Sequence, residues 1–418
     1  MSKRKHRDSV DELLDSCPTS PEKPDSDFPL YFEPEAFYLQ SLDLTPIELQ
    51  LLSSLLSTFK LGVHLYRLGQ DPNRAAKNDA KPFDVAERTE AGKLCATYIK
   101  NALSSHMAGD KKYPLRLTGP SMSFISTILP ALLTSHDMFQ LCIFRAFAFG
   151  DLLRLQLLVL PKPGGGGKQT GTQEPDFKAL LLILRGWTGP TGSGISLSAY
   201  GQFQVIFAKI PLMLERLWSF SVDLAMLWHS TAYSTPKIPP SFTSIYEMLY
   251  KKEIPSLPRG GLVVWLIACD MAEYGICTMP TINDYIEHLL SKPKVSGPSN
   301  AINAIAAHVG ADPPDDIELE TMLKTVWKAI EDGTKEWPAK EKFRGGPNVL
   351  QEIVKECGVV QKRPLQVMDL EHALCKISRQ VKKLKVLKGE DAVVATGANK
   401  LASSSSSSSS SSRKKSKA

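Results

Sequence analysis

Hydrophobic residues recur every three or four positions through most of the chain, which is the period of a helix with one buried face. The segment TPIE at residues 45–48 combines a capping box with a proline at the first helical position. Just after it, Leu51, Leu55 and Phe59 fall on one helical face. The pattern therefore predicts an amphipathic helix that begins at residue 45 or 46.

The same period predicts helices up to residue 388. They are expected at about 85–107, 121–134, 137–160, 198–229, 241–252, 259–274, 281–291, 299–309, 316–332, 347–357 and 367–388. The helix at 198–229 is expected to kink near Pro211. No Asn-Gly or Asp-Gly turn joins two alternating segments, so no β-hairpin is predicted. The expected fold class is all-α.

Changes in composition divide the chain into four parts. Residues 1–40 form a charged arm that prolines interrupt, and we expect it to be disordered. Residues 41–235 are predicted to form an N-terminal helical lobe with a flexible glycine-rich loop at 161–176. Residues 236–388 are predicted to form a C-terminal helical lobe, with a cleft between the two. Residues 389–418 form a basic, serine-rich tail, also expected to be disordered.

The charge is small but unevenly distributed. The chain has a net charge of +6, with 43% hydrophobic and 22% charged residues. Residues 1–7 carry +4, residues 8–37 carry −8 and residues 413–417 carry +4, so these segments cancel. The excess of positive charge therefore belongs mostly to the helical part, where it permits an anionic partner.

The sequence predicts a protein that stays inside the cell. An acidic, proline-rich segment follows the basic N-terminus, where a signal peptide needs an apolar core. The most apolar stretch, residues 138–160, carries Arg145, Asp151 and Arg154, which are costly inside a membrane. We interpret it as a pair of buried helices and expect no membrane contact. The two basic ends fit either a nuclear import signal or a solvated run of charge.

Motifs for catalysis or metal binding are missing. The glycines at 164–167 resemble a phosphate-binding loop, but Lys162 replaces its first glycine and Gln169 follows the lysine. The glycines at 189–194 are interpreted as a loop, with a phosphate contact as the alternative. The eight histidines form no HExxH or HxH pair, and the seven cysteines form no CxxC pair. We expect buried reduced thiols, no enzyme activity, no cofactor and no metal.

Basic residues within the apolar helices are the candidate binding residues. A buried arginine needs an anion, either an internal carboxylate such as Asp151 or Glu215, or a phosphate in a groove. The basic amphipathic helix at 370–388 likewise either packs on the core or contacts a partner. The candidates for an RNA-binding groove are Arg145, Arg154, Arg185, Lys209, Arg216, Lys251, Lys252 and Arg259.

Residues 199–229 and 259–310 resemble in texture the nucleoproteins of negative-strand RNA viruses, and most of all the rhabdovirus-like members from plants and fungi. The resemblance extends over about residues 40–390. It implies that the two lobes clamp single-stranded genomic RNA in a basic cleft without reading its sequence. It also implies a homo-oligomeric nucleocapsid built by exchange of terminal arms, a viral phosphoprotein and polymerase as possible partners, and a location in the virion and the host cytoplasm or nucleus.

The same features fit a second class of protein, a cellular helical scaffold or nuclear interaction protein that does not coat RNA. An RNA-coating protein should have a continuous positive cleft. A scaffold should have arginines paired internally and an exposed apolar groove.

Overall fold

A computed structural model of the chain describes residues 42–70, 115–128, 134–158, 174–189, 192–196, 204–232, 238–257, 261–291, 296–334 and 349–387. The helix predicted at 85–107, both charged arms and most of the loop at 161–176 lie outside the described residues.

Helices dominate the described part, so the all-α prediction is confirmed there. The α-helices are α2 (Pro46–Gln70), α6 (Pro120–Ile128), α7 (Ser135–Ile143), α8 (Leu152–Leu157), α9 (Phe177–Arg185), α10 (Ile210–Ala232), α11 (Phe242–Lys251), α12 (Leu262–Glu273), α13 (Ile282–Leu290), α14 (Gly297–His308), α15 (Asp316–Thr334), α16 (Val349–Gln361) and α17 (Val367–Leu387). The shorter elements are the 3-10 turns η3 (Arg116–Thr118) and η6 (Phe207–Lys209), the π-helix η4 (Phe144–Ala148) and the strands β1 (Gly194–Ser196) and β2 (Gln204–Ile206).

Local side-chain caps determine where several helices begin. At the start of α2, the backbone N–H and the hydroxyl of Thr45 donate to Glu48 Oε2 at 2.8 and 2.7 Å. Thr134 and Thr281 begin α7 and α13 with the same reciprocal arrangement. Each cap satisfies backbone N–H groups that the first turn of a helix leaves without a partner. The helix start predicted at residues 45–48 is confirmed.

The helix predicted at 198–229 is wrong over residues 204–209, where the structure has β2 and η6, and residues 198–203 lie outside the described residues. β2 pairs antiparallel with β1, with Gly194 opposite Ile206. The strands are three residues long and no two-residue turn joins them, so the usual hairpin signal is missing from the sequence. α10 begins only at Ile210, and Pro211 lies in its first turn instead of kinking it, because proline is tolerated where the backbone N–H needs no helical partner.

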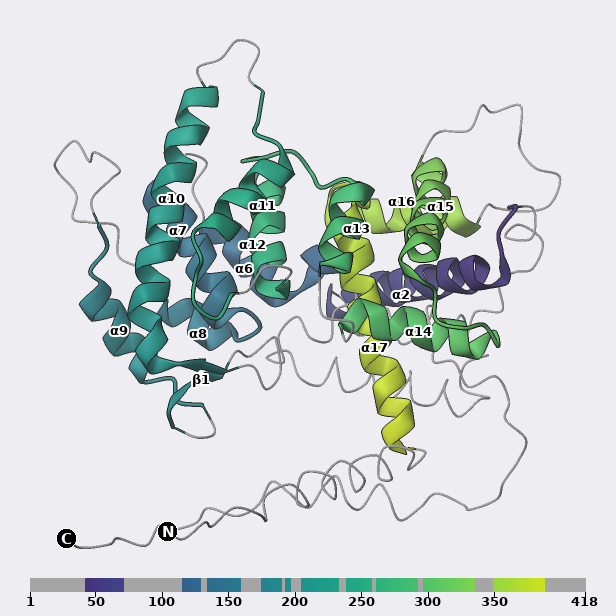
Figure 1. The fold of residues 1–418 in the computed structure, drawn as a ribbon, viewed down its shortest axis with the longest axis horizontal. Helices are drawn as coiled ribbons and strands as arrows, with labels where there is room; N and C mark the ends of the chain where they lie inside the picture. Colours follow the sequence, from purple (N-terminus) through teal and green to yellow (C-terminus); the bar gives the residue numbers. More distant parts are fainter. Residues whose placement is uncertain are drawn as a thin grey trace, which may run out of the picture.

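Figure 1 shows the helices in two groups, α6–α12 with the strands on one side and α2 with α13–α17 on the other. The first helix thus packs on the last ones, since α2 contacts α14, α15, α16 and α17. In the other direction, α11 and α12 pack against α7, η4 and α10. Helices before the predicted boundary between residues 235 and 236 thus pack against helices after it, in both groups. The division into two lobes with a cleft stays a prediction.

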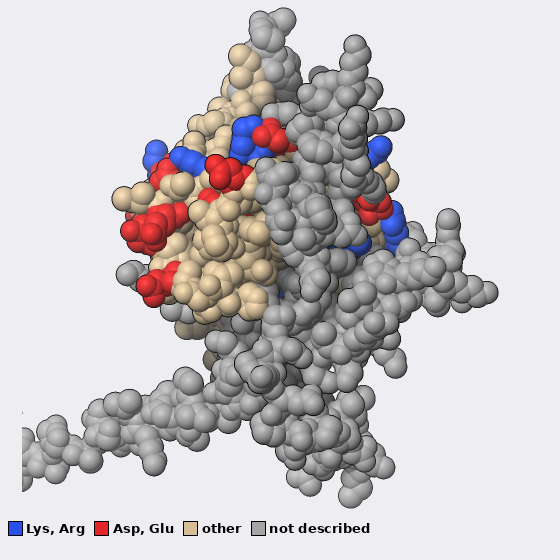
Figure 2. Space-filling view, turned by 90° about the vertical axis from the view of Figure 1, so that its right-hand side faces the viewer, with Lys and Arg blue, Asp and Glu red and all other residues tan. Residues whose placement is uncertain are grey.

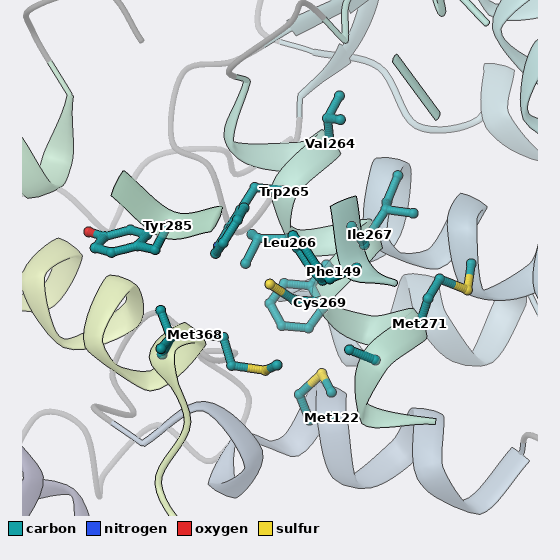
Figure 3. Packing of buried hydrophobic residues seen from close by; sticks show 14 of the residues in the cluster. Met122, Phe149, Val264, Trp265, Leu266, Ile267, Cys269, Met271, Tyr285 and Met368 are labelled. Carbon is teal, nitrogen blue, oxygen red and sulfur yellow. The ribbon is translucent and has the colours of Figure 1, made fainter. Parts of the chain in front are cut away.

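The helix α12 lies within the core. Its residues from Val264 to Ala272 are all buried, and their side chains project to several sides of the helix (Figure 3). Trp265 faces Tyr285 of α13, with ring centroids 5.8 Å apart. Buried hydrophobic residues from Leu51 to Ile377 join in one cluster. Apart from Asp270, the buried part of α12 is apolar on all its sides, as expected for a helix in the interior, and α12 connects the two groups of helices.

We expect Gly194→Ala to destabilise the fold, because an added Cβ would lie 2.2 Å from the carbonyl oxygen of Val205. Either the strand pairing opens or the backbone shifts, at a cost of about 1–3 kcal/mol. Thermal unfolding followed by circular dichroism measures this loss. The exposed Thr188→Ala is the control, and an equal unfolding temperature for the two variants would contradict the prediction.

Candidate nucleic-acid surface

Arg145 lies in η4 and is only 1% exposed. Its Nε donates to Asp270 Oδ2 at 2.6 Å and its Nη2 donates to Asp270 Oδ1 at 2.5 Å. The guanidinium also lies 3.6 Å from the ring centroid of Phe149. Arg145 therefore has an internal carboxylate as its partner and presents no charge to a groove. The sequence left this alternative open, but the partner is Asp270 instead of Asp151 or Glu215.

The pair belongs to a larger buried network. Asp270 also accepts a hydrogen bond from Arg116 Nη2, and Arg116 Nε lies 3.5 Å from Glu273 Oε1. Arg363 Nε donates to Glu273 Oε2 at 2.8 Å and its Nη1 donates to Asp369 Oδ2 at 2.6 Å. We call these residues the arginine–carboxylate network: Arg116, Arg145, Arg363, Asp270, Glu273 and Asp369.

The charges of this network balance, with three positive and three negative side chains. Burial alone would lower the pKa of Arg363, but the neighbouring carboxylates of Asp369 and Glu273 raise it above its ordinary value. The arginine stays charged in the interior for that reason. The network joins η3 and η4 to α12, and α12 to the segment that leads into α17.

Arg154 is the second candidate with internal partners. Its Nε lies 3.3 Å from Asp151 Oδ2, and its Nη1 donates to the carbonyl oxygen of Ser196 at 2.6 Å. The guanidinium lies over Trp187 at 5.2 Å. Arg154 thus fastens α8 to β1.

Lys252 is the third candidate with internal partners. Its Nζ lies 2.5 Å from Asp223 Oδ2 and 2.9 Å from Ser219 Oγ. Both acceptors belong to α10, so the lysine holds the end of α11 against that helix. Asp223 keeps 41% of its side chain exposed, which makes this a surface ion pair.

Arg185, Lys209, Arg216 and Lys251 are exposed, and none of them forms an ion pair within the described part of the chain. Arg259 lies outside the described residues. Of the four exposed cations, the first three lie at the end of α9, in η6 and early in α10. α9 packs against α10, and Figure 1 shows it beside the first half of that helix. The structure thus brings these three onto neighbouring elements.

Sequence reasoning missed Lys178, which is exposed on α9. It precedes Arg185 by seven residues, so the two share a helix face. That spacing was visible in the sequence and could have identified it. We use the name α9–α10 surface for these exposed residues of α9, β2, η6 and the start of α10: Lys178, Leu182, Arg185, Ile206, Lys209, Leu212 and Arg216.

The α9–α10 surface is apolar as well as basic. Leu182, Ile206 and Leu212 are 68%, 49% and 45% exposed. Leu182 lies between Lys178 and Arg185 on the same face of α9. Glu215 is exposed beside Arg216, so the surface is not uniformly positive.

The face on the right of Figure 1 has a different distribution of charge. Figure 2 shows acidic and basic side chains next to one another there, beside a broad area without charged residues. On α15, Lys324 and Lys328 pair with Glu320 and Asp332 at 2.6 and 2.5 Å. The positive charges of these two lysines are thus neutralised by carboxylates one helical turn away on α15.

The described residues include several cysteines. Cys142, Cys269 and Cys357 are buried free thiols in helices, as predicted, whereas Cys277 is buried in the turn after α12 and Cys375 on α17 is half-buried. Burial raises the pKa of the four buried thiols, to about 12 for Cys277, so they stay protonated. No group of His, Cys, Asp or Glu there could hold a metal ion. None of the described helices is long and apolar enough to cross a membrane.

Comparison with known proteins adds no relative. No family model, curated protein or solved structure matches the chain. The described residues define an all-α protein with a buried arginine–carboxylate network and an exposed surface that is basic and apolar. The resemblance to viral nucleoproteins stays a prediction.

We expect Asp270→Ala to cost about 3–5 kcal/mol of stability, because it leaves Arg116 and Arg145 buried without their shared carboxylate. Asp223→Ala is the matched control, since it removes a carboxylate from an exposed pair and should cost less than about 1 kcal/mol. Denaturant unfolding measures both. Similar losses in the two variants would mean that the buried network matters no more than a surface pair.

Proposed function

We propose that the protein binds single-stranded RNA through the α9–α10 surface and polymerises on it, in the manner of a viral nucleoprotein. The observation that carries this proposal is the exposure of Arg185, Lys209 and Arg216, which have no ion-pair partner within the described residues. Cations that no carboxylate neutralises are available to phosphates. Arg145 is left out of the proposed contact because its guanidinium lies in the interior.

The spacing of the cations suits an extended polyanion. Lys209 and Arg216 are seven residues apart, close to two helical turns and about 10 Å along the axis. Another seven residues along α10 lies Asp223, whose carboxylate is paired with Lys252 at the end of α11, next to the exposed Lys251. Lys209 and Arg216 are thus the two cations with this helical spacing. Contacts of this kind hold the sugar-phosphate backbone and carry no sequence preference.

Assembly follows from the resemblance and belongs to the same proposal. Protomers would exchange the terminal arms at residues 1–40 and 389–418 to form a homo-oligomeric nucleocapsid in the virion and the host cell. A viral phosphoprotein and polymerase are further proposed partners. No cofactor, metal or membrane has a part in this function.

We expect the triple variant Arg185→Ala, Lys209→Ala, Arg216→Ala to bind RNA at least tenfold more weakly, by about the same factor for every sequence. The slope of log affinity against log salt should fall by about 2, since each lost phosphate contact contributes about 0.7 for a single strand. Fluorescence anisotropy of labelled oligonucleotides over a salt series measures both quantities.

The double variant Lys324→Ala, Lys328→Ala is the control, because those lysines are paired with carboxylates on α15. It should bind RNA like the unchanged chain. If the unchanged chain binds no single-stranded oligonucleotide in a salt-sensitive way, the proposal fails.

A scaffold that does not coat RNA is the second candidate, and specific observations favour it. Arg145, Arg154 and Lys252 are paired internally, as expected for a scaffold. In addition, Leu182 and Leu212 are exposed on the surface where a partner helix could bind.

The state of the purified full-length chain distinguishes the two candidates. RNA coating predicts co-purified nucleic acid, seen as excess absorbance near 260 nm, and particles larger than a monomer in electron micrographs. A scaffold predicts clean protein that carries no nucleic acid.

A further inference from the structure

A groove between α11 and α13 has no part in the proposed function. It is shallow and open to solvent, and its empty space of about 330 Å³ includes that open solvent. Its lining consists of Phe242, Thr243, Tyr246, Glu247, Asp284, Glu287, His288 and Ser291. Three of these residues are carboxylates, three carry aromatic rings (Phe242, Tyr246 and His288), and none is lysine or arginine.

Contacts between the two helices hold the groove in shape. Thr243 Oγ1 donates to Asp284 Oδ1 at 2.5 Å, and the Tyr246 hydroxyl is hydrogen-bonded to His288 Nδ1 at 3.1 Å. Below them, the ring of His288 stacks on Trp265 of α12, with centroids 4.4 Å apart and an interplanar angle of 16°. Trp265 is part of the buried core in Figure 3, so the floor of the groove is fixed to the centre of the protein.

This lining is suited to a cation. The negative charge of the carboxylates attracts an ammonium or guanidinium group, and the partly exposed ring of Tyr246 can add a cation–π contact. The same carboxylates repel phosphates. The groove is therefore unsuited to RNA and suited to lysine or arginine side chains.

We propose that this groove docks the basic C-terminal segment of the same chain, Arg413-Lys414-Lys415-Ser416-Lys417. The segment carries four positive charges opposite the three carboxylates of the groove. It follows Leu387, the last residue of α17, by 26 residues, which span at most about 90 Å. α13 packs against α17, so the segment can reach the groove of its own chain.

The tether gives a function to the ten serines at residues 403–412. A polar connection of this kind keeps the basic segment at a high effective concentration near the groove without binding there itself. While docked, the four charges lie against α11 and α13 and are not available to an import receptor or to RNA. This proposal does not depend on RNA binding by the α9–α10 surface.

A labelled peptide of residues 403–418 tests the docking by fluorescence anisotropy. The full-length variant Arg413→Gln, Lys414→Gln, Lys415→Gln, Lys417→Gln lacks the competing tail and should bind the peptide at least fivefold more tightly than the unchanged chain. In that variant, the further changes Glu247→Gln and Glu287→Gln should lower the affinity at least tenfold. The matched control is Asp312→Asn, Glu352→Gln, which removes two exposed carboxylates elsewhere and should have no effect.

A charge-reversal variant distinguishes a lost binding site from a misfolded protein, because a gain of binding to a new peptide requires a folded groove. Glu247→Lys, Glu287→Lys should lose the basic peptide and bind instead a peptide whose four cations are replaced by glutamate. Equal affinity of the basic peptide for the groove variants and the control would overturn the proposal. Tighter binding by a peptide of residues 1–9, which is also basic, would overturn the choice of occupant. The RNA assay on the same proteins reports separately on the proposed function.

Discussion

The carboxylate of Asp270 is the constraint on which the packing of this protein depends. It is fully buried and binds Arg116 and Arg145, which precede it by 154 and 125 residues. An unpaired ion in the interior costs several kcal/mol, so η3 and η4 can be buried only where this carboxylate meets both arginines. A purely apolar contact tolerates small rotations and shifts of a helix, but a bidentate ion pair does not. The core therefore derives its area from hydrophobic residues and its alignment from one aspartate on α12.

The network also explains how the two groups of helices stay connected. Glu273, one turn beyond Asp270 on α12, accepts hydrogen bonds from Arg363, which in turn donates to Asp369 at the start of α17. One side of α12 thus faces η4, and the adjacent turn leads to α17, which packs with α2. Because its positive and negative charges balance, the network adds no net charge to the protein. Cations that could act on a partner must lie elsewhere, and those of the α9–α10 surface do.

Local information was sufficient for part of this fold. The capping box at Thr45, the helix pair within residues 138–160 and the buried cysteines follow from periodicity and composition. The strands β1 and β2 could not be predicted, because three-residue strands leave no alternation to detect and Gly194 acquires its importance only from the approach of Val205. The position of α2 was equally inaccessible, since its partners lie more than 200 residues later in the chain.

The candidate cations fall into a buried and an exposed group, and the sequence around Arg145 and Arg216 indicates in part to which group each belongs. Arg145 is the sole polar residue in LCIFRAFAFG, residues 141–150, and all ten residues are buried, so its anion had to come from another segment. Arg216 lies between the exposed Glu215 and the buried Leu217. This change from exposed to buried positions is typical of an amphipathic helix whose charged residues face the solvent. For these two arginines the neighbours agree with where the side chain lies. Arg185, exposed between Leu184 and Gly186, and Arg363, paired internally beside Lys362, do not follow that pattern. The identity of Asp270 as the partner of Arg145 is a tertiary fact that no local window of the sequence contains.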